Sequence, residues 1–170
     1  MSGAQVAAAT RGVLFMHCCP AAIGPHVEWA LAGVLGRACK LEWSAQAAAP
    51  GNLRAEATWY GPIGTAARLA AALRAWPMLV FEITEDGTST TDGERLAYVP
   101  GRGFHRSAMT ASGDLAIGEE RIRGLLSRAK SGEELIHGLH ELLGSAWDAE
   151  LEPYRVAGDG SPVVLLHKVV

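Results

Sequence analysis

The sequence predicts an α+β protein with a ferredoxin-like βαββαβ core, an extended antiparallel sheet and two C-terminal helices. Two observations lead to this fold class. Within residues 11–85, apolar periodicity follows the order strand, helix, two strands, helix, strand, and residues 94–170 continue with further strands and then helical patterns. We therefore expect a single domain over residues 1–170, with a flexible N-terminus at 1–10, the ferredoxin-like core at 11–85 and the sheet extension with its covering helices at 94–170.

The core begins with a strand and a helix. Residues 12–18 form a short apolar run bounded by turn residues, which is typical of a central strand buried on both faces. Apolar residues then recur at helical spacing, with Pro25 suited to the first helical turn and Gly36 to the helix exit. The first strand should lead directly into this helix.

A hairpin, a second helix and a fourth strand complete the core. Residues 41–46 and 53–59 alternate between apolar and polar side chains, which predicts a hairpin with one polar face. The glycine-containing turn at residues 61–65 breaks this pattern, and residues 66–76 carry an amphipathic helix. Apolar positions 79, 81 and 83 begin the fourth strand.

The second half of the chain extends the sheet and then becomes helical. Further antiparallel strands are expected at residues 95–99, 104–110 and 115–117. A helix over residues 119–129 has acidic residues in its first turn and basic residues near its last, as the helix dipole favours. A second helix follows Gly132, and residues 162–170 are strongly β-forming.

Composition narrows the possible functions. The 170 residues carry a net charge of −3 and have a mean hydropathy of +0.12, with 49% hydrophobic and 19% charged residues. Such a chain can bury a core, and its acidic balance argues against nucleic acid or an anionic membrane surface as a partner. No long apolar run and no secretory leader pattern is evident, so we expect a cytoplasmic protein.

The cysteines and a histidine-rich helix predict no metal and no cofactor. Cys18, Cys19 and Cys39 are odd in number and lack zinc-ligand spacing, so we expect small buried residues in a reducing compartment. Glu134 and His137 form a Glu-x-x-His pair, but a second such pair is missing. A solvated helix face is the favoured interpretation.

Polar residues near the end of the first strand form the candidate ligand site. His17, His26 and Glu28 could rim a pocket at a helix N-terminus, where free N–H groups favour an anion. Alternatively, Glu28 complements the helix dipole and the histidines bond loop carbonyls. On the polar sheet face, Arg54 and Glu56, together with Glu42, could bind a ligand or pair with charges on the covering helices.

A second candidate surface lies near the C-terminus. Trp147, Asp148, Glu150 and Tyr154 combine aromatic and acidic side chains and could dock a partner, although ordinary packing of the two aromatic residues is the alternative. No nucleophile elbow, catalytic triad or phosphate-binding loop is recognisable, so no catalytic residues are assigned.

Four parts of the chain resemble an actinobacterial family classed as a domain of unknown function (number 3145). They are RGVLF at 11–15 with PHVEWA at 25–30, APG at 49–51 with RAE at 54–56, GTAARLA at 64–70, and AWD at 146–148 with EPYR at 152–155 and LHKV at 166–169. The likeness covers nearly the whole chain. It implies a single domain and an accessory role linked to fatty-acid metabolism, but transfers no catalytic residue.

Two hypotheses of function follow. The first is a non-catalytic binding or regulatory module whose partner is a small molecule, another protein or a second copy of the chain. The second is an enzyme or carrier-handling accessory protein that acts on an acyl or phosphate-bearing small molecule, with His17, His26 and Glu28 as acid/base or anchoring groups.

Overall fold

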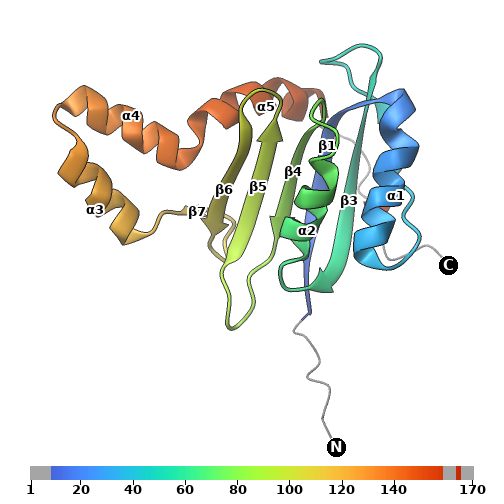
Figure 1. Ribbon diagram of the computed structural model, residues 1–170, viewed down its shortest axis with the longest axis horizontal. Helices are drawn as coiled ribbons and strands as arrows, with labels where there is room; N and C mark the ends of the chain where they lie inside the picture. Colours follow the sequence, from blue (N-terminus) through green and yellow to red (C-terminus); the bar gives the residue numbers. More distant parts are fainter. Residues whose placement is uncertain (1–8, 159–163, 166–170) are drawn as a thin grey trace, which may run out of the picture.

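The sheet of this protein runs through the whole fold, with helices on both of its faces (Figure 1). The structure is a computed structural model that describes residues 9–158 and 164–165. Its strands are β1 (Ala9–Pro20), β2 (Ser44–Ala45), β3 (Asn52–Pro62), β4 (Val80–Glu85), β5 (Gly93–Val99), β6 (Gly103–Met109), β7 (Leu115–Ala116) and β8 (Val164–Leu165). Its helices are α1 (Gly24–Leu35), α2 (Thr65–Leu73), α3 (Glu119–Arg128), α4 (Gly132–Leu143) and α5 (Ser145–Gly158), with a 3-10 turn at Ala21–Ile23.

The strand order is β2-β3-β1-β4-β5-β6-β7, and each of these neighbouring pairs is antiparallel. The short strand β8 pairs with β3 in the parallel direction. The expected mixed α/β architecture with an extended antiparallel sheet is therefore confirmed. β1 is central, as predicted, because it lies between β3 and β4.

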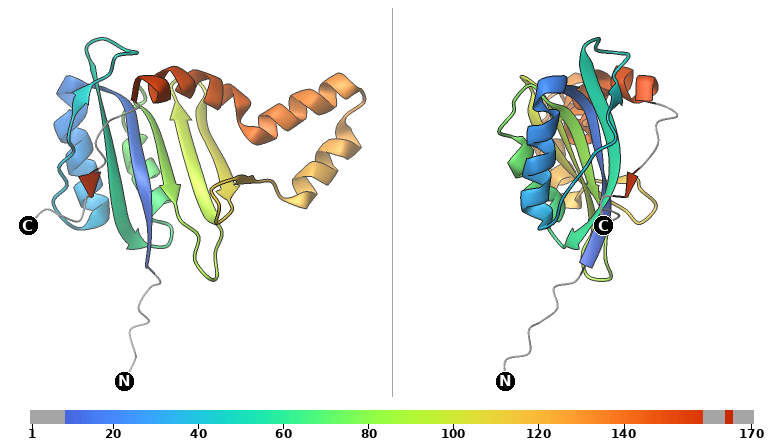
Figure 2. Two further views of the ribbon diagram at one scale, coloured as in Figure 1. Left: turned by 180° about the vertical axis from the view of Figure 1, so that it is seen from behind. Right: turned by 90° about the vertical axis from the view of Figure 1, so that its right-hand side faces the viewer.

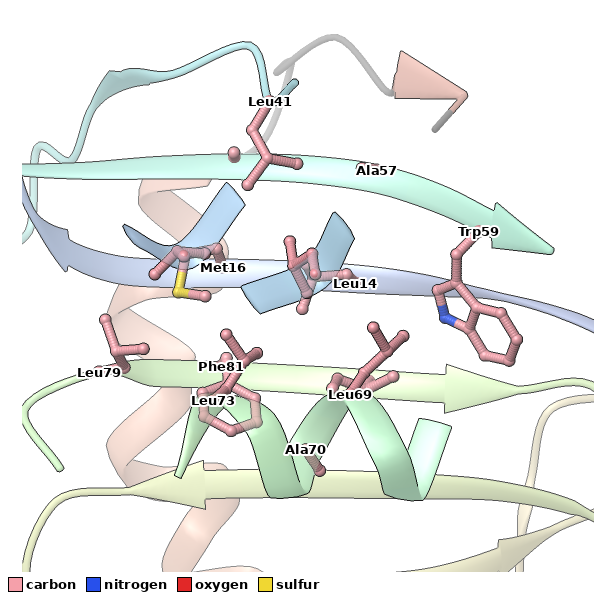
Figure 3. Packing of buried hydrophobic residues seen from close by; sticks show 14 of the residues in the cluster. Leu14, Met16, Leu41, Ala57, Trp59, Leu69, Ala70, Leu73, Leu79 and Phe81 are labelled. Carbon is pink, nitrogen blue, oxygen red and sulfur yellow. The ribbon is translucent and has the colours of Figure 1, made fainter. Parts of the chain in front are cut away.

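One face of the sheet carries the apolar core under α1 and α2 (Figure 3). Leu14 and Met16 of β1, Trp59 of β3 and Phe81 of β4 are almost completely buried there, together with Leu69 of α2. Gly12 belongs to this arrangement, since a Cβ at this position would collide with the Thr84 carbonyl and the Trp59 ring. Alternation of the strand side chains explains why every second residue faces this core.

The opposite face is covered by α5, which is best seen in the edge view of Figure 2. Here β1 presents Val13 and Phe15, which are only half-buried, so the expectation that β1 is buried on both faces is correct for one face only. Leu151 of α5 forms a small apolar cluster with Cys18 and Val80. Most of the remaining contact between α5 and the sheet is polar.

The C-terminal half differs from the expectation in two respects. A third helix, α5, follows α4, although residues 145–158 include Pro153 and were not expected to be helical. α3 and α4 do not cover the sheet but project from it as a helical arm (Figure 1). No residue of α4 is buried, and Ile136 and Leu139 are among its exposed apolar side chains.

The predicted hairpin also differs, because residues 41–46 pair with β3 only at Ser44 and Ala45. The turn at residues 61–65 binds a carboxylate of the chain itself. Glu85 accepts hydrogen bonds from the backbone N–H groups of Gly64 (2.7 Å) and Ala66 (2.8 Å), at the N-terminus of α2. The N–H groups that could have held a phosphate are thus occupied.

Candidate functional site

His17 lies on the face covered by α5, because it alternates with Val13 and Phe15 along β1. The register of β1 shifts between Met16 and Cys18 against β4, and between Met16 and Cys19 against β3. Such bulges re-aim side chains. Here the bulge turns Cys18 to the same face as His17, where Cys18 packs in the Leu151 cluster. The ring of His17 lies 6.5 Å, between ring centroids, from Tyr154 of α5.

A network of charges surrounds His17, and the buried Glu82 of β4 is its centre. Glu82 is only 5% exposed. Its carboxylate accepts hydrogen bonds from His17 Nε2 (2.7 Å), Arg95 Nε (2.7 Å) and two nitrogens of Arg155 (2.7 and 2.9 Å). Burial alone would raise the pKa of Glu82, but the bonds from His17 and Arg155 and the charge of Arg95 outweigh it and hold this pKa well below its usual range.

Asp148 completes the charge network from α5. It accepts hydrogen bonds from Arg95 (2.7 Å) and Arg155 (2.9 Å), so each arginine bridges two carboxylates. Burial would lower the pKa of Arg155, yet its contacts with Glu82 and Asp148 raise it. All the charged groups of this network are paired with one another, and their ion pairs attach α5 to the sheet.

The candidate docking residues all take part in this junction of α5 and the sheet. Trp147 donates from Nε1 to the Gly103 carbonyl (2.9 Å) and Glu150 pairs with Arg102. Tyr154 packs near His17, and Asp148 lies in the charge network. For the two aromatic residues this is the ordinary packing that the sequence offered as the alternative.

Beside the charge network lies a cavity of about 170 Å³. It is bounded by β1, β3, the segment around β2 and the end of α5, and its lining residues are Phe15, Met16, His17, Glu42, Ser44, Arg54, Ala55, Glu56, Tyr154, Arg155 and Gly158. Three of the expected ligand-binding residues, His17, Arg54 and Glu56, are thus brought together. We call this space the β3 cavity.

The β3 cavity differs from the charge network because two of its charged residues, Arg54 and Glu56, have no partner among the described residues. Within the described residues, neither Arg54 nor Glu56 has a hydrogen bond or ion pair, and the Nε of Arg54 is buried without an acceptor. Burial raises the pKa of Glu56, and the charges of His17 and Arg54 oppose this effect. A guanidinium and a carboxylate on one wall can therefore accept an outside partner.

The other two expected pocket residues lie elsewhere, so His17, His26 and Glu28 do not form the expected pocket. His26 is exposed on α1, and neither it nor Glu28 lines the β3 cavity. His17 faces α5, whereas α1 packs on the opposite face of the sheet (Figure 2).

Glu28 instead fastens the segment that follows α1. It is 7% exposed and accepts hydrogen bonds from Lys40 Nζ (2.8 Å), Leu41 N (3.0 Å) and Trp43 Nε1 (3.1 Å). It lies beyond the first turn of α1, so it does not act on the helix dipole as expected. Burial would raise the pKa of Glu28, but these hydrogen bonds lower it.

Sequence reasoning missed Glu82, Arg95 and Arg155. The signal for Glu82 was present, because Val80, Glu82 and Thr84 alternate with the apolar residues of β4 and a charge in such a strand is rarely buried without a partner. The two arginines gave no comparable signal, since their partners are far away in the sequence.

The remaining candidates behave as side chains with local roles. Glu134 accepts a hydrogen bond from Lys130 N (2.7 Å) beside the Ser131 cap of α4, and His137 is exposed. Within residues 9–158 and 164–165, no group of three His, Cys, Asp or Glu side chains could hold a metal ion. The three cysteines are free and buried, as predicted, and burial raises the pKa of Cys19 to about 11.

Fold and site together define a mixed α/β protein in which a C-terminal helix, held by buried charges, closes one side of a small polar cavity. The family model described as "Protein of unknown function (DUF3145)" matches residues 13–168, and the chain belongs to this family. Comparisons with curated proteins and with solved structures find no match. In the part of the chain that the structure describes, no helix has the length and apolar character needed to cross a membrane.

Proposed function

We propose that this protein is a non-catalytic binding or regulatory module that holds a small molecule in the β3 cavity. The observation that carries the proposal is the contrast between Arg54 and the neighbouring network. Arg95 and Arg155 each bond to both Glu82 and Asp148, whereas the buried Nε of Arg54 has no acceptor in the part of the chain that the structure describes. A buried donor without an acceptor costs about 1–3 kcal/mol, which a bound ligand would recover.

The architecture of the core supports this proposal. We take residues 11–85 to be a ferredoxin-like unit, since β2-β3-β1-β4 are mutually antiparallel neighbours and α1 and α2 connect them across one face. On the other face of this unit, the β3 cavity lies between the strands and the end of α5. The three free cysteines favour a reducing compartment such as the cytoplasm.

Native mass spectrometry of protein purified gently from its own host tests the proposal. We expect a co-purifying small molecule, and we expect its occupancy to fall in Arg54→Met. Arg74→Met removes a charge from an exposed position outside the cavity and serves as the matched control. A folded wild-type protein with no bound molecule, and no thermal stabilisation by any compound of a metabolite library, would exclude the binding function.

An enzymatic role is the second candidate, and the His17–Glu82 pair is the observation that favours it. His17 Nε2 bonds to the carboxylate of Glu82, and His17 also lines the β3 cavity. His17 could then act as acid or base on an acyl or phosphate-bearing molecule, in an accessory role in fatty-acid metabolism.

Turnover of acyl thioesters and phosphate esters distinguishes the two candidates. The enzymatic role requires measurable wild-type turnover that is lost in His17→Gln while ligand binding persists. His26→Ala is the control, because His26 lies outside the cavity. Turnover that depends on His17 would replace the non-catalytic proposal.

A further inference from the structure

We infer that the ligand of the β3 cavity is a small zwitterion, which places a carboxylate on Arg54 and a protonated amine on Glu56. This inference rests on the proposed binding function and names the ligand class. The positions, burial and partners of the charged groups in the cavity support this inference.

Two opposite charges lie on one wall of the β3 cavity. Arg54 and Glu56 are alternate residues of β3, so their side chains leave the same face of the sheet about 7 Å apart. No ion pair joins them, although each is close enough to influence the other electrostatically. Two opposite charges held apart in this way can each bind one end of a zwitterion.

The guanidinium of Arg54 is suited to bind a carboxylate. Gly158 allows this group to approach the end of α5, since a Cβ on that glycine would lie 2.7 Å from a terminal nitrogen of Arg54. The Nε is buried without an acceptor. Guanidinium groups bind carboxylates through two parallel N–H···O bonds, and such a pair would satisfy this Nε.

The free charges in the cavity favour a zwitterion over a dianion or a simple amine. Arg155 also lines the β3 cavity, but its donors are committed to Glu82 and Asp148. Arg54 is therefore the one free guanidinium among the described lining residues, and it shares the cavity with Glu56 and Glu42. A dianion such as phosphate would meet repulsion from both carboxylates, and a simple amine would leave Arg54 unsatisfied.

The volume of the β3 cavity and its apolar walls indicate the size of the ligand. Phe15 and Tyr154 supply apolar surface beside the charges. The cavity volume of about 170 Å³ is below the roughly 300–1,000 Å³ of sites for drug-sized ligands. A molecule of the size of an α-amino acid, with a small apolar side chain, matches both properties.

The test compares a zwitterion with its two halves. The twenty common amino acids are first titrated singly into the full-length protein and followed by NMR chemical shifts. The tightest binder is then compared with its analogues that lack the amine or the carboxylate. For leucine these are 4-methylpentanoate and 3-methylbutylamine. We expect the amino acid to bind at least tenfold more tightly than either analogue.

Charge variants then assign each end of the ligand. Arg54→Met should reduce the affinity for the amino acid to that for the amine, and Glu56→Gln should reduce it to that for the carboxylate. Arg74→Met and Glu120→Gln, at exposed positions, should leave all three affinities unchanged. If Arg54→Met folds poorly, Arg54→Lys replaces it. This variant keeps the positive charge but cannot form the two parallel hydrogen bonds, so it should retain part of the affinity.

Failure of the inference is distinguishable from failure of the proposed function. Equal affinities for the amino acid and one of its analogues overturn the zwitterion. Binding of inorganic phosphate or of an acyl compound that requires Arg54 also overturns the zwitterion. In that case the proposed binding function remains valid. If no amino acid or analogue binds and native mass spectrometry also finds no small molecule, both are wrong.

Discussion

The two faces of the sheet are built on different principles. The face under α1 and α2 is apolar, and its large side chains Trp59 and Phe81 are completely buried. The face under α5 buries Glu82 and engages Arg95 and Arg155, so its cohesion depends on charges. Buried ion pairs add little net stability, because desolvation offsets their attraction, but they fix one geometry. The apolar face therefore supplies stability, and the charged face holds a site in place.

This difference explains why the β3 cavity lies on the charged face. The apolar face has no room for a ligand, since strand and helix side chains interlock there (Figure 3). On the other face, α5 is fastened in its first turn by Asp148 and in its last turn by Arg155, and the cavity opens beside that attachment.

The largest effect should come from opening the apolar face. Trp59→Ala removes a completely buried indole and leaves a cavity, which should lower the free energy of unfolding by about 4 kcal/mol. Urea denaturation followed by circular dichroism measures the loss. Trp29→Ala is the control, because Trp29 is 78% exposed and its removal should change the stability little. A loss below 1 kcal/mol at Trp59 would contradict this account of the apolar face.

Breaking the charge network should cost somewhat less. Glu82→Gln leaves Arg95 and Arg155 partly buried with an incomplete set of partners, and removal of one member of a buried pair costs about 3 kcal/mol. The same denaturation experiment measures it, with Glu120→Gln as the exposed control. A neutral Glu82→Gln would mean that the charged face is held by Leu151 and its neighbours instead.

Acid should reveal the same network. The pKa of Glu82 is lower in the folded protein than its ordinary value of 4.5, so the carboxylate contributes stability above pH 4.5 that is lost as the pH falls towards the folded pKa. The stability difference between wild type and Glu82→Gln should therefore be constant at neutral pH and shrink below pH 4.5. Denaturation curves at a series of pH values test this expectation, and a difference that grows in acid would reverse the sign of the shift.

Glu28 offers a carboxylate on the side of α1 for comparison with Glu82. Glu28→Ala leaves Leu41 N and the Trp43 indole without their acceptor, which should cost about 2 kcal/mol. Ligand binding in the β3 cavity should be unaffected, because Glu28 is not part of its lining. Measuring stability and binding in the same variant separates a structural carboxylate from a site residue. A loss of binding in folded Glu28→Ala would restore this residue to the site.

Sequence reasoning was most successful where the signal is local. The periodicity of α1 and the left-handed Gly36 at its end, with φ of 68°, agree with the expected helix and its exit. It was least successful at residues 145–158, where Pro153 hid a helix whose stability comes from contacts with distant strands. The extent of β2 was overestimated for a similar reason, since Glu28 and other tertiary contacts hold residues 40–43 outside the sheet.

The site was predictable only in part. Alternation on β3 correctly gave Arg54 and Glu56 a common polar face, and the structure adds His17 to them. Alternation with Val13 and Phe15 would have placed His17 on the same face, whereas the bulge that turns Cys18 towards α5 could not be read from the sequence, because register shifts depend on the partner strands. His17 was instead grouped with His26 and Glu28, which are close to it in sequence but lie on the other side of the sheet.

The smallest effect is expected in the α3–α4 arm, which belongs to neither face. Leu139 is 36% exposed, and α4 has no buried residue, so Leu139→Ala removes few packed contacts. Its loss should change the free energy of unfolding by about 0.5 kcal/mol or less. Ligand binding in the β3 cavity should be unchanged as well, because the arm supplies none of its lining. A loss comparable to that of Trp59→Ala would mean that Leu139 is covered in solution, and concentration-dependent unfolding would then show whether a second copy covers it.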